Sequence, residues 1–160
     1  PKRAETIAYT APYVLIEGTY LVRNDSPIKA IDDVDQDGIT VAVGKNAAYD
    51  LFLTRTLKKA EIVRYPLSED AIERFDADGI STVAGVRQPL NTHAGQFPGY
   101  RVLEGRFTVI EQAMGCPKGR GKAAALVHRY LEFAKASGMV ADGLQRSGEG
   151  GATVAPAAKA

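Results

Sequence analysis

The segment PKRAETIAYTAPY, residues 1–13, runs directly into the apolar stretch VLIEGTYLV, residues 14–22. The first part has a basic pair and then a short apolar and aromatic run ending in TAPY, which is more typical of the interior of a protein than of its beginning. The second part is rich in β-branched and aromatic side chains, which predicts one long strand over residues 13–23. The sequence NDSP that follows predicts a turn, because these residue types favour turn conformations.

Strand and helix signals alternate along residues 39–103. We expect short strands at residues 39–43, 61–65, 80–84 and 100–103, helices at about 47–59, 68–75 and 88–96, and a short helix at 31–34. Asn46 and Ser68 are the expected N-caps, because their side chains accept a free backbone N–H of the first helical turn. Strands separated by helices of this length favour a parallel α/β sheet with right-handed crossovers.

A second long β-like segment over residues 106–114 mirrors the first, and we expect the two to flank the α/β unit as hinge strands. An amphipathic helix is predicted after residue 117 and ends at Gly138, because apolar residues recur on one helical face. This apolar stripe comprises Leu126, Val127, Tyr130, Leu131 and Ala134. A shorter helix is expected at 139–145. The segment 147–160, rich in Gly, Ala and Pro, is expected to be a flexible tail.

The composition describes an ordinary globular chain. Its 160 residues, 45% of them apolar, are enough for one domain with a core. The net charge of +1 gives no reason to expect a nucleic-acid partner. The single cysteine, Cys116, excludes an internal disulfide, and no apolar run reaches the roughly 20 residues of a membrane-spanning helix. Because His93, His128 and Cys116 lack a metal-ligand spacing, we expect no metal, and no cofactor is implied.

The opening segment resembles the pattern x-x-R…(F/Y)-(S/T)-x-P-Y of the bacterial extracellular solute-binding proteins of family 3, which deliver amino acids to ABC importers. VRNDSPIKAIDDVD at residues 22–35 is similar to the family's passage out of its hinge, and VAVGKNAAY at 41–49 to its strand-to-helix turn. ADGISTVAGV at 77–86 fits a later strand of the family, and KASGMVADGLQRSG at 135–148 resembles its closing helix. The order and spacing of these segments make the match fairly specific.

The resemblance implies an α/β fold of the periplasmic-binding-protein-like type 2. Residues 1–23 would be a remnant of the first lobe with one hinge strand, and 24–105 the second lobe with a parallel-dominated sheet. Residues 106–146 would supply the return hinge strand and C-terminal helices, and 147–160 the flexible tail. Most of the first lobe would then be lacking, as in a gene fragment or a late start site.

The function implied by the resemblance is that of the substrate-binding component of an ABC-type importer, which captures a small carboxylate or amino-acid-like solute. The intact relative is periplasmic and presents its closed form to an ABC permease. No chemistry is expected. Since half of the cleft would be missing, binding by the monomer should be weak, and the exposed hinge and terminal helices predict a homodimer.

The candidate ligand-binding residues are Arg3, Gly44, Asn46, Ala48, Tyr49 and Arg87. Arg3 carries a planar guanidinium that matches a carboxylate, and the resemblance places it on the ligand's α-carboxylate. The alternative is a solvated terminal arginine. The turn at 44–49 leads into a helix N-terminus, whose free N–H groups and positive dipole end suit an anion.

This turn departs from the family's pattern, because Ala47 and Ala48 replace the usual hydroxyl residues. Asn46 tolerates the left-handed conformation where the family has Gly, and Tyr49 could supply a hydroxyl or a stacking face. A plain helix cap is the alternative for Asn46. Where the family often has an aspartate for the ligand's ammonium, this chain has Val86 or Arg87. Arg87 favours a second anionic group, hence a carboxylate or dicarboxylate, unless it is a surface arginine.

Two other classes remain possible. A prephenate-dehydratase-like enzyme on the same fold would need an acid in the cleft, and Glu17 and Glu111 are the available acids. If the two long strands pair, these carboxylates could approach each other and perturb each other's pKa. A sensory ligand-binding module is the other rival, although no transmembrane segment follows Gly148 in this sequence.

Overall fold

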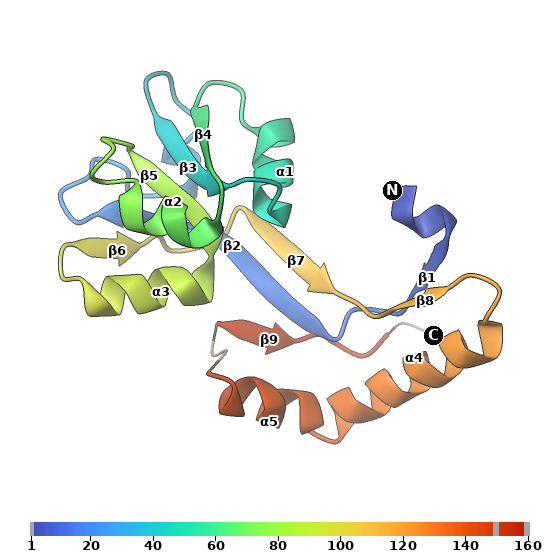
Figure 1. The fold of residues 1–160 in the computed structure, drawn as a ribbon. Helices are drawn as coiled ribbons and strands as arrows, with labels where there is room; N and C mark the ends of the chain where they lie inside the picture. Colours follow the sequence, from blue (N-terminus) through green and yellow to red (C-terminus); the bar gives the residue numbers. More distant parts are fainter. Residues whose placement is uncertain (1, 149–150, 159–160) are drawn as a thin grey trace. The chain divides into compact units, whose positions relative to one another are not determined.

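The computed structural model describes residues 2–148 and 151–158. It forms two compact units, one comprising Pro1–Ile16 with Glu111–Ala160 (unit 1) and the other Glu17–Ile110 (unit 2). The chain passes from one unit to the other within strand β2 (Val14–Arg23) and returns within β7 (Thr108–Gln112), and these strands pair with each other. Both long β segments predicted from sequence are therefore strands, although β7 is shorter than expected (Figure 1).

Unit 2 is built on a sheet in which the strand order is β4-β3-β5-β2-β6. Its other strands are β3 (Thr40–Gly44), β4 (Glu61–Tyr65), β5 (Thr82–Val86) and β6 (Tyr100–Val102). β3 is parallel to both β4 and β5, and β2 is antiparallel to β5 and β6. Four strands therefore share one direction and β2 opposes them, which confirms the predicted parallel-dominated α/β sheet.

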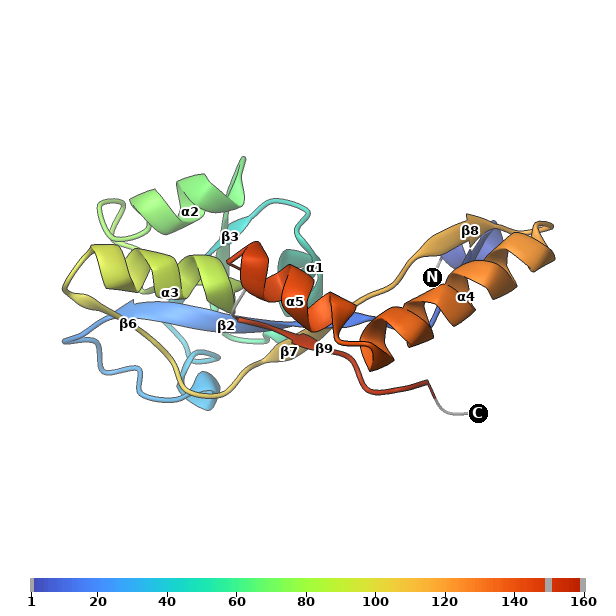
Figure 2. The same cartoon turned by 90° about the horizontal axis from the view of Figure 1, so that it is seen from below.

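The helices of unit 2 cover both faces of this sheet. They are α1 (Ala48–Thr56), α2 (Ser68–Arg74) and α3 (Arg87–Gln96), with the 3-10 helix η2 (Ile31–Asp33). Alternate residues of a strand point to opposite faces. Tyr20 belongs to the apolar cluster that contains Leu53 of α1, whereas Leu21 belongs to the cluster of α2 and α3. α2 and α3 therefore share one face, as Figure 2 shows, and α1 covers the other.

Carboxylates, and not the residues expected from sequence, accept the backbone N–H groups at two of these helix ends, the start of α2 and the end of α1. Ser68 is the first residue of α2 rather than its cap, because Leu67 is the N-cap and its N–H donates to Asp70 Oδ2 at 3.2 Å. α1 ends three residues earlier than expected. The amides of residues 58–60 turn away from the helix and donate to the Asp35 carboxylate at 2.8–3.1 Å, measured to Oδ1.

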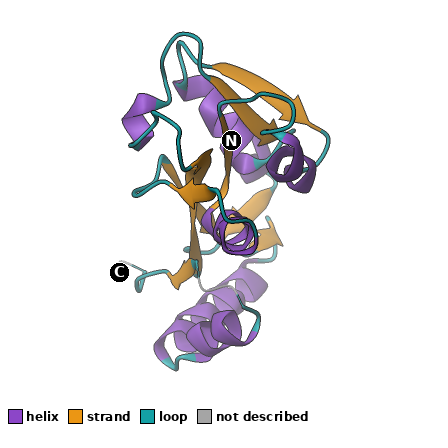
Figure 3. Cartoon of the chain, turned by 90° about the vertical axis from the view of Figure 1, so that its left-hand side faces the viewer, coloured by secondary structure: helices purple, strands orange, loops and turns teal. Residues whose placement is uncertain are grey.

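Unit 1 contains two β pairs and two helices. β1 (Ile7–Tyr9) is antiparallel to β8 (Gly115–Pro117), and the first residues of β2 are antiparallel to β9 (Ala152–Val154). The 3-10 helix η1 (Lys2–Glu5) opens the unit. α4 (Gly121–Ala136) and α5 (Met139–Arg146) pack against each other and are drawn purple in Figure 3. These are the predicted C-terminal helices.

Composition predicts a flexible tail over residues 147–160, and the described part of this segment contains a short strand; residues 149–150 and 159–160 lie outside the described residues. β9 pairs with residues 14–16, the side chain of Ala155 is buried, and the Ala155 N–H donates to the Tyr13 carbonyl at 3.0 Å. Lys135 Nζ adds hydrogen bonds to the carbonyls of Pro12, at 3.2 Å, and Pro156, at 2.9 Å. Residues 152–156 are thus held to unit 1 by backbone and side-chain contacts.

The apolar stripe of α4 is only partly buried. Leu131 and Ala134 are buried, but Leu126 and Tyr130 are 61% and 52% exposed, and Phe133 is 61% exposed.

Across the described ranges, no helix combines the length and the apolar character that crossing a membrane requires.

Candidate ligand site

The parallel strands of unit 2 end together at one edge of the sheet. β3, β4 and β5 end at Gly44, Tyr65 and Val86, and a helix begins within a few residues of each end. The adjacent strands β3 and β5 lead into α1 and α3, which lie on opposite faces. In open α/β sheets, a crevice forms where successive helices diverge in this way, and ligands bind in it.

A pocket of about 240 Å³ occupies this edge. Its walls are Tyr49, Ser68, Glu69, Ile72, Gly85, Val86 and Pro89. Small-molecule sites are commonly about 300–1,000 Å³ and combine apolar walls with a few polar groups, so this pocket suits a small ligand. Of the residues predicted from sequence, Tyr49 lines it.

Gly44 allows β3 to approach the start of α2. A Cβ atom at this position would lie 2.4 Å from Ser68 Oγ and 2.8 Å from the Ser68 backbone, closer than any side chain tolerates. The Tyr49 hydroxyl reaches the same place and donates to Ser68 Oγ at 2.6 Å. Burial raises the pKa of Tyr49, while its hydrogen bonds with Ser68 and the Gly44 amide oppose the rise. Tyr49 therefore lines the pocket as a neutral phenol.

The turn into α1 is built around Asn46. This residue has a φ of 64°, the left-handed conformation anticipated from its type, and no other non-glycine residue in the described part has a positive φ. Asn46 is nevertheless not the N-cap, since Ala47 holds that position without a side-chain hydrogen bond. Asp50 closes the turn instead, because its Oδ2 accepts the Asn46 N–H at 2.8 Å. The prediction of an Asn46 cap is wrong for this reason.

Asp50 is a buried carboxylate, and Arg64 neutralises it through a 3.0 Å contact between Nε and Oδ1. The exposed residue Ala48 starts the helix, and the first amides of a helix have no intrahelical acceptor. The start of α1 thus offers backbone donors and the positive end of the helix dipole next to Tyr49.

Arg87 is the first residue of α3 but does not line the pocket. Its Nε lies 2.8 Å from Glu17 Oε2, and its guanidinium also donates to the carbonyls of Leu103 and Gly105. Arg106 Nη1 contacts the other oxygen of Glu17 at 2.5 Å. The Arg106 hydrogen bond, followed by that of Arg87, lowers the pKa of Glu17 against the opposing effect of burial. Arg87 is thus already neutralised inside unit 2.

Glu69 is a pocket residue that the sequence did not single out. It is exposed, and its side chain makes no hydrogen bond or ion pair with any other described residue. Its position in the first turn of α2, directly after β4, was the available signal. That signal becomes informative only once β4 and β5 are known to be parallel strands of one sheet.

The remaining acidic and basic candidates lie elsewhere. Arg3 is an exposed residue of η1 in unit 1, so its ligand role stays a prediction. Glu111 is exposed in unit 1, whereas Glu17 belongs to unit 2. Among the described residues, no three His, Cys, Asp or Glu side chains come together in a way that could hold a metal ion.

The sequence matches no family model and no curated protein. Solved structures do resemble it. An ABC-transporter binding component from Wolinella succinogenes, complexed with lysine, has a TM-score of 0.76 at 16% identity, over 91% of this chain and 64% of its own. A solute receptor for L-cysteine of Neisseria gonorrhoeae has a TM-score of 0.74 at 18% identity, over 91% and 59%.

A third similar structure is an ancestral amino acid-binding protein, a precursor of cyclohexadienyl dehydratase. Its TM-score is 0.73 at 20% identity, over 91% of this chain and 63% of its own. The chain therefore has the type 2 periplasmic-binding-protein fold, and it spans less than two thirds of the length of these neighbours.

Proposed function

We propose that this chain is the substrate-binding component of an ABC-type importer for a small amino-acid-like solute. The observation that carries the proposal is the pocket at the carboxyl ends of β3, β4 and β5, next to the first turn of α1. The structural neighbours that bind lysine, L-cysteine or amino acids support the same class of solute.

The polar groups of the pocket fit the two ends of an amino acid. The amides at the start of α1 would receive the carboxylate, since a helix N-terminus favours an anion. Glu69 would receive the ammonium, which otherwise lacks a counter-charge at the end of β5. A dicarboxylate is disfavoured, because the guanidinium of Arg87 already pairs with Glu17. Ile72 and Pro89 would pack against a small side chain.

Titration of ¹⁵N-labelled protein with an amino-acid panel and a dicarboxylate tests this assignment. We expect weak, saturable shifts of the amide signals of Ala48 and Glu69 with small amino acids. Glu69→Gln should weaken that binding roughly tenfold, as expected for a lost charge-assisted hydrogen bond. Glu73→Gln, on the same helix but outside the pocket walls, is the matched control. Tighter binding of dicarboxylates, or no shift at these amides, would refute the proposal.

The partners and compartment follow from the same proposal. A binding component of this kind works outside the cytoplasmic membrane, in the periplasm, and delivers its ligand to a permease. We also infer that the chain forms a homodimer through α4. Leu126, Tyr130 and Phe133 expose large apolar side chains on this one helix, and contiguous apolar patches mark interaction surfaces.

The dehydratase-like alternative finds little support in the acids available to it. A general acid needs a raised pKa at neutral pH, whereas two guanidinium groups lower the pKa of Glu17. The one observation that favours this alternative is the similarity to the dehydratase precursor, which is itself described as amino acid-binding. Binding without turnover is therefore the function proposed here.

A further inference from the structure

Unit 2 contains a second and larger cavity on the face that α1 covers. Its volume is about 550 Å³, within the roughly 300–1,000 Å³ typical of small-molecule sites. It is bounded by residues 31–36, the C-terminal half of α1, Tyr20 of β2 and residues 106–107. It shares no lining residue with the pocket at the carboxyl edge, so the two are separate sites.

Tyr20 points to a ligand in this cavity. Its side chain is 1% exposed, yet its hydroxyl has no hydrogen-bond partner among the described residues. Every fully buried polar side-chain atom in the same part of the chain does have a partner. The Tyr20 hydroxyl must therefore border accessible space, and the cavity that Tyr20 lines is that space. A hydroxyl that faces accessible space bonds water there, and a ligand with a polar group in the cavity can take the place of that water.

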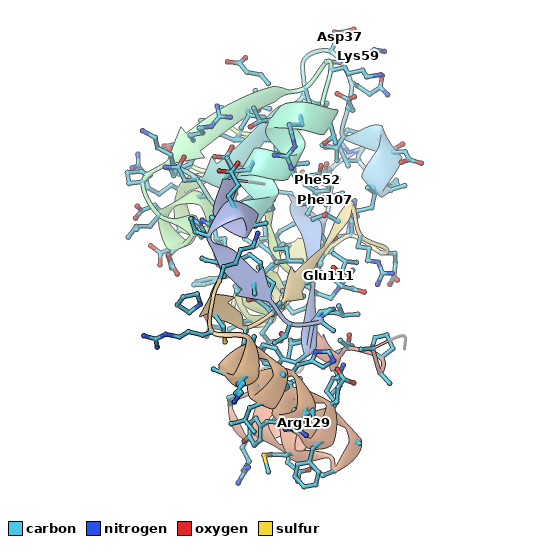
Figure 4. The ribbon with its side chains drawn as sticks, turned by 90° about the vertical axis from the view of Figure 1, so that its right-hand side faces the viewer. Asp37, Phe52, Lys59, Phe107, Glu111 and Arg129 are labelled. Carbon is cyan, nitrogen blue, oxygen red and sulfur yellow. The ribbon has the colours of Figure 1, made fainter. Side chains whose placement is uncertain are left out.

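The cavity also offers aromatic surface next to Tyr20. The Phe107 ring lies 4.6 Å from the Tyr20 ring, centroid to centroid, and 6.0 Å from the Phe52 ring. Figure 4 shows Phe52 and Phe107 next to each other. Both are cavity walls and only half-buried, so each ring leaves apolar surface for a guest. Aromatic rings of this kind favour a guest that itself has a ring.

The charges at the cavity are those that a cation requires. Asp32 is exposed and has no ion pair or hydrogen bond with another described residue, so its carboxylate is available. Asp35 is a second acidic wall residue, but its carboxylate already accepts hydrogen bonds from the backbone N–H groups of residues 58–60. Arg106 is the one basic wall residue, and its guanidinium pairs with Glu17. The unpaired charge is therefore negative.

We propose that this cavity binds a small aromatic amine. The ring of the ligand packs on Phe52 and Phe107, a polar ring substituent bonds the Tyr20 hydroxyl, and the ammonium faces Asp32. Burial, with the nearby carboxylate of Asp35, raises the pKa of Tyr20, so its hydroxyl stays neutral and can both donate and accept. This site differs from the proposed amino-acid pocket in its residues and in its ligand.

Two probes of the same shape and opposite charge test the proposal. Tyramine and 4-hydroxyphenylacetate carry the same ring and hydroxyl, and each is titrated into ¹⁵N-labelled protein. We expect tyramine to shift the amide signals of Tyr20, Phe52 and Phe107 and to bind roughly tenfold more tightly than the acid. Tyr20→Phe should reduce the affinity for tyramine roughly three- to tenfold, the value of one neutral hydrogen bond.

The variants separate binding from folding. Tyr20→Phe removes a hydroxyl that has no partner in the described structure, so its melting temperature should not fall. Asp32→Asn should abolish the preference for tyramine over the acid, whereas Asp37→Asn, the exposed acid labelled in Figure 4 and no part of the cavity wall, should retain it. Equal binding of both probes, an unchanged affinity in Tyr20→Phe, or shifts confined to the α1 and α2 N-termini would overturn the proposal, leaving a cavity that holds water.

Discussion

Glu17 on β2 and Arg87 at the first position of α3, 70 residues apart in the chain, are joined by a 2.8 Å ion pair. The pair joins α3 to β2, the strand by which the chain enters unit 2, and Arg106 contacts the other oxygen of the same carboxylate. Two guanidinium groups on one carboxylate form a network, which contributes more to stability than an isolated surface pair.

This network predicts a pH-dependent loss of stability. Because the folded-state pKa of Glu17 is lowered from its ordinary value of 4.5, the stabilisation is present above that pH and is lost as the pH falls through the folded pKa. Glu17→Gln should therefore lower the free energy of unfolding by about 1 kcal/mol at neutral pH, and the difference should vanish in acid. Urea unfolding across this pH range measures it. Glu111→Gln, at an exposed acid on β7, is the control and should leave the free energy of unfolding at neutral pH unchanged.

Gly44→Ala should destabilise unit 2, because its new Cβ would lie 2.4 Å from Ser68 Oγ and 2.8 Å from the Ser68 backbone. Overpacking of this kind costs roughly 1–3 kcal/mol. Gly143→Ala in α5 is the matched control, since nothing lies within 4 Å of its added Cβ and Ala is the better helix former. Thermal unfolding that ranks the two variants in the opposite order would show that Gly44 is not needed for this close approach.

Because Asn46 has a left-handed backbone, two substitutions at this position should change the stability in opposite directions. Asn46→Gly should keep or raise the stability, because glycine adopts a φ of 64° without strain. Asn46→Val should lose roughly 1–2 kcal/mol, the cost of this conformation for an ordinary side chain. Both variants keep the backbone N–H that Asp50 accepts. Equal unfolding midpoints for the two would mean that the turn relaxes to another conformation.

The exposed face of α4 predicts self-association. Light scattering coupled to size exclusion should give a mass that rises with concentration towards that of a dimer. Phe133→Ser should raise the dissociation constant by roughly tenfold, as truncation of a large aromatic contact does. Leu51→Ser on α1, which removes a side chain that is 49% exposed, is the control and should have no effect. A monomer at all concentrations would exclude α4 as the interface.

The alternation of strands and helices could be predicted because it rests on local signals. The β-branched run of β2 and the apolar spacing of α4 each lie within a single segment of sequence. The strand and the helix that they predict are both present at the expected positions. The left-handed Asn46 was also predictable, since few residue types adopt that conformation. Its failure as a cap was not, because Asp50 competes for the same turn from inside the helix.

The features that were missed depend on distant partners. β9 consists of three residues in an Ala- and Gly-rich segment. It forms a strand because it pairs with the backbone of residues 14–16. The pairing of Arg87 with Glu17 depends on contacts between α3 and β2 that no local pattern encodes. Glu69 enters the pocket because β4 ends beside its parallel neighbours. Periodicity shows none of these relationships, since each joins residues far apart in the sequence.

Unit 2 is one continuous stretch of chain, whereas unit 1 is assembled from both ends of it. Unit 1 therefore forms only after the whole of unit 2 has been brought into a closed loop, and the conformational entropy of that closure opposes its formation. Contacts of such long sequence separation form slowly. During synthesis, β1 can pair with β8, and β2 with β9, only after residues 111–158 have been made. We therefore expect the sheet of β3, β4 and β5 to form first, and the pairs of β1 with β8 and of β2 with β9 to form last.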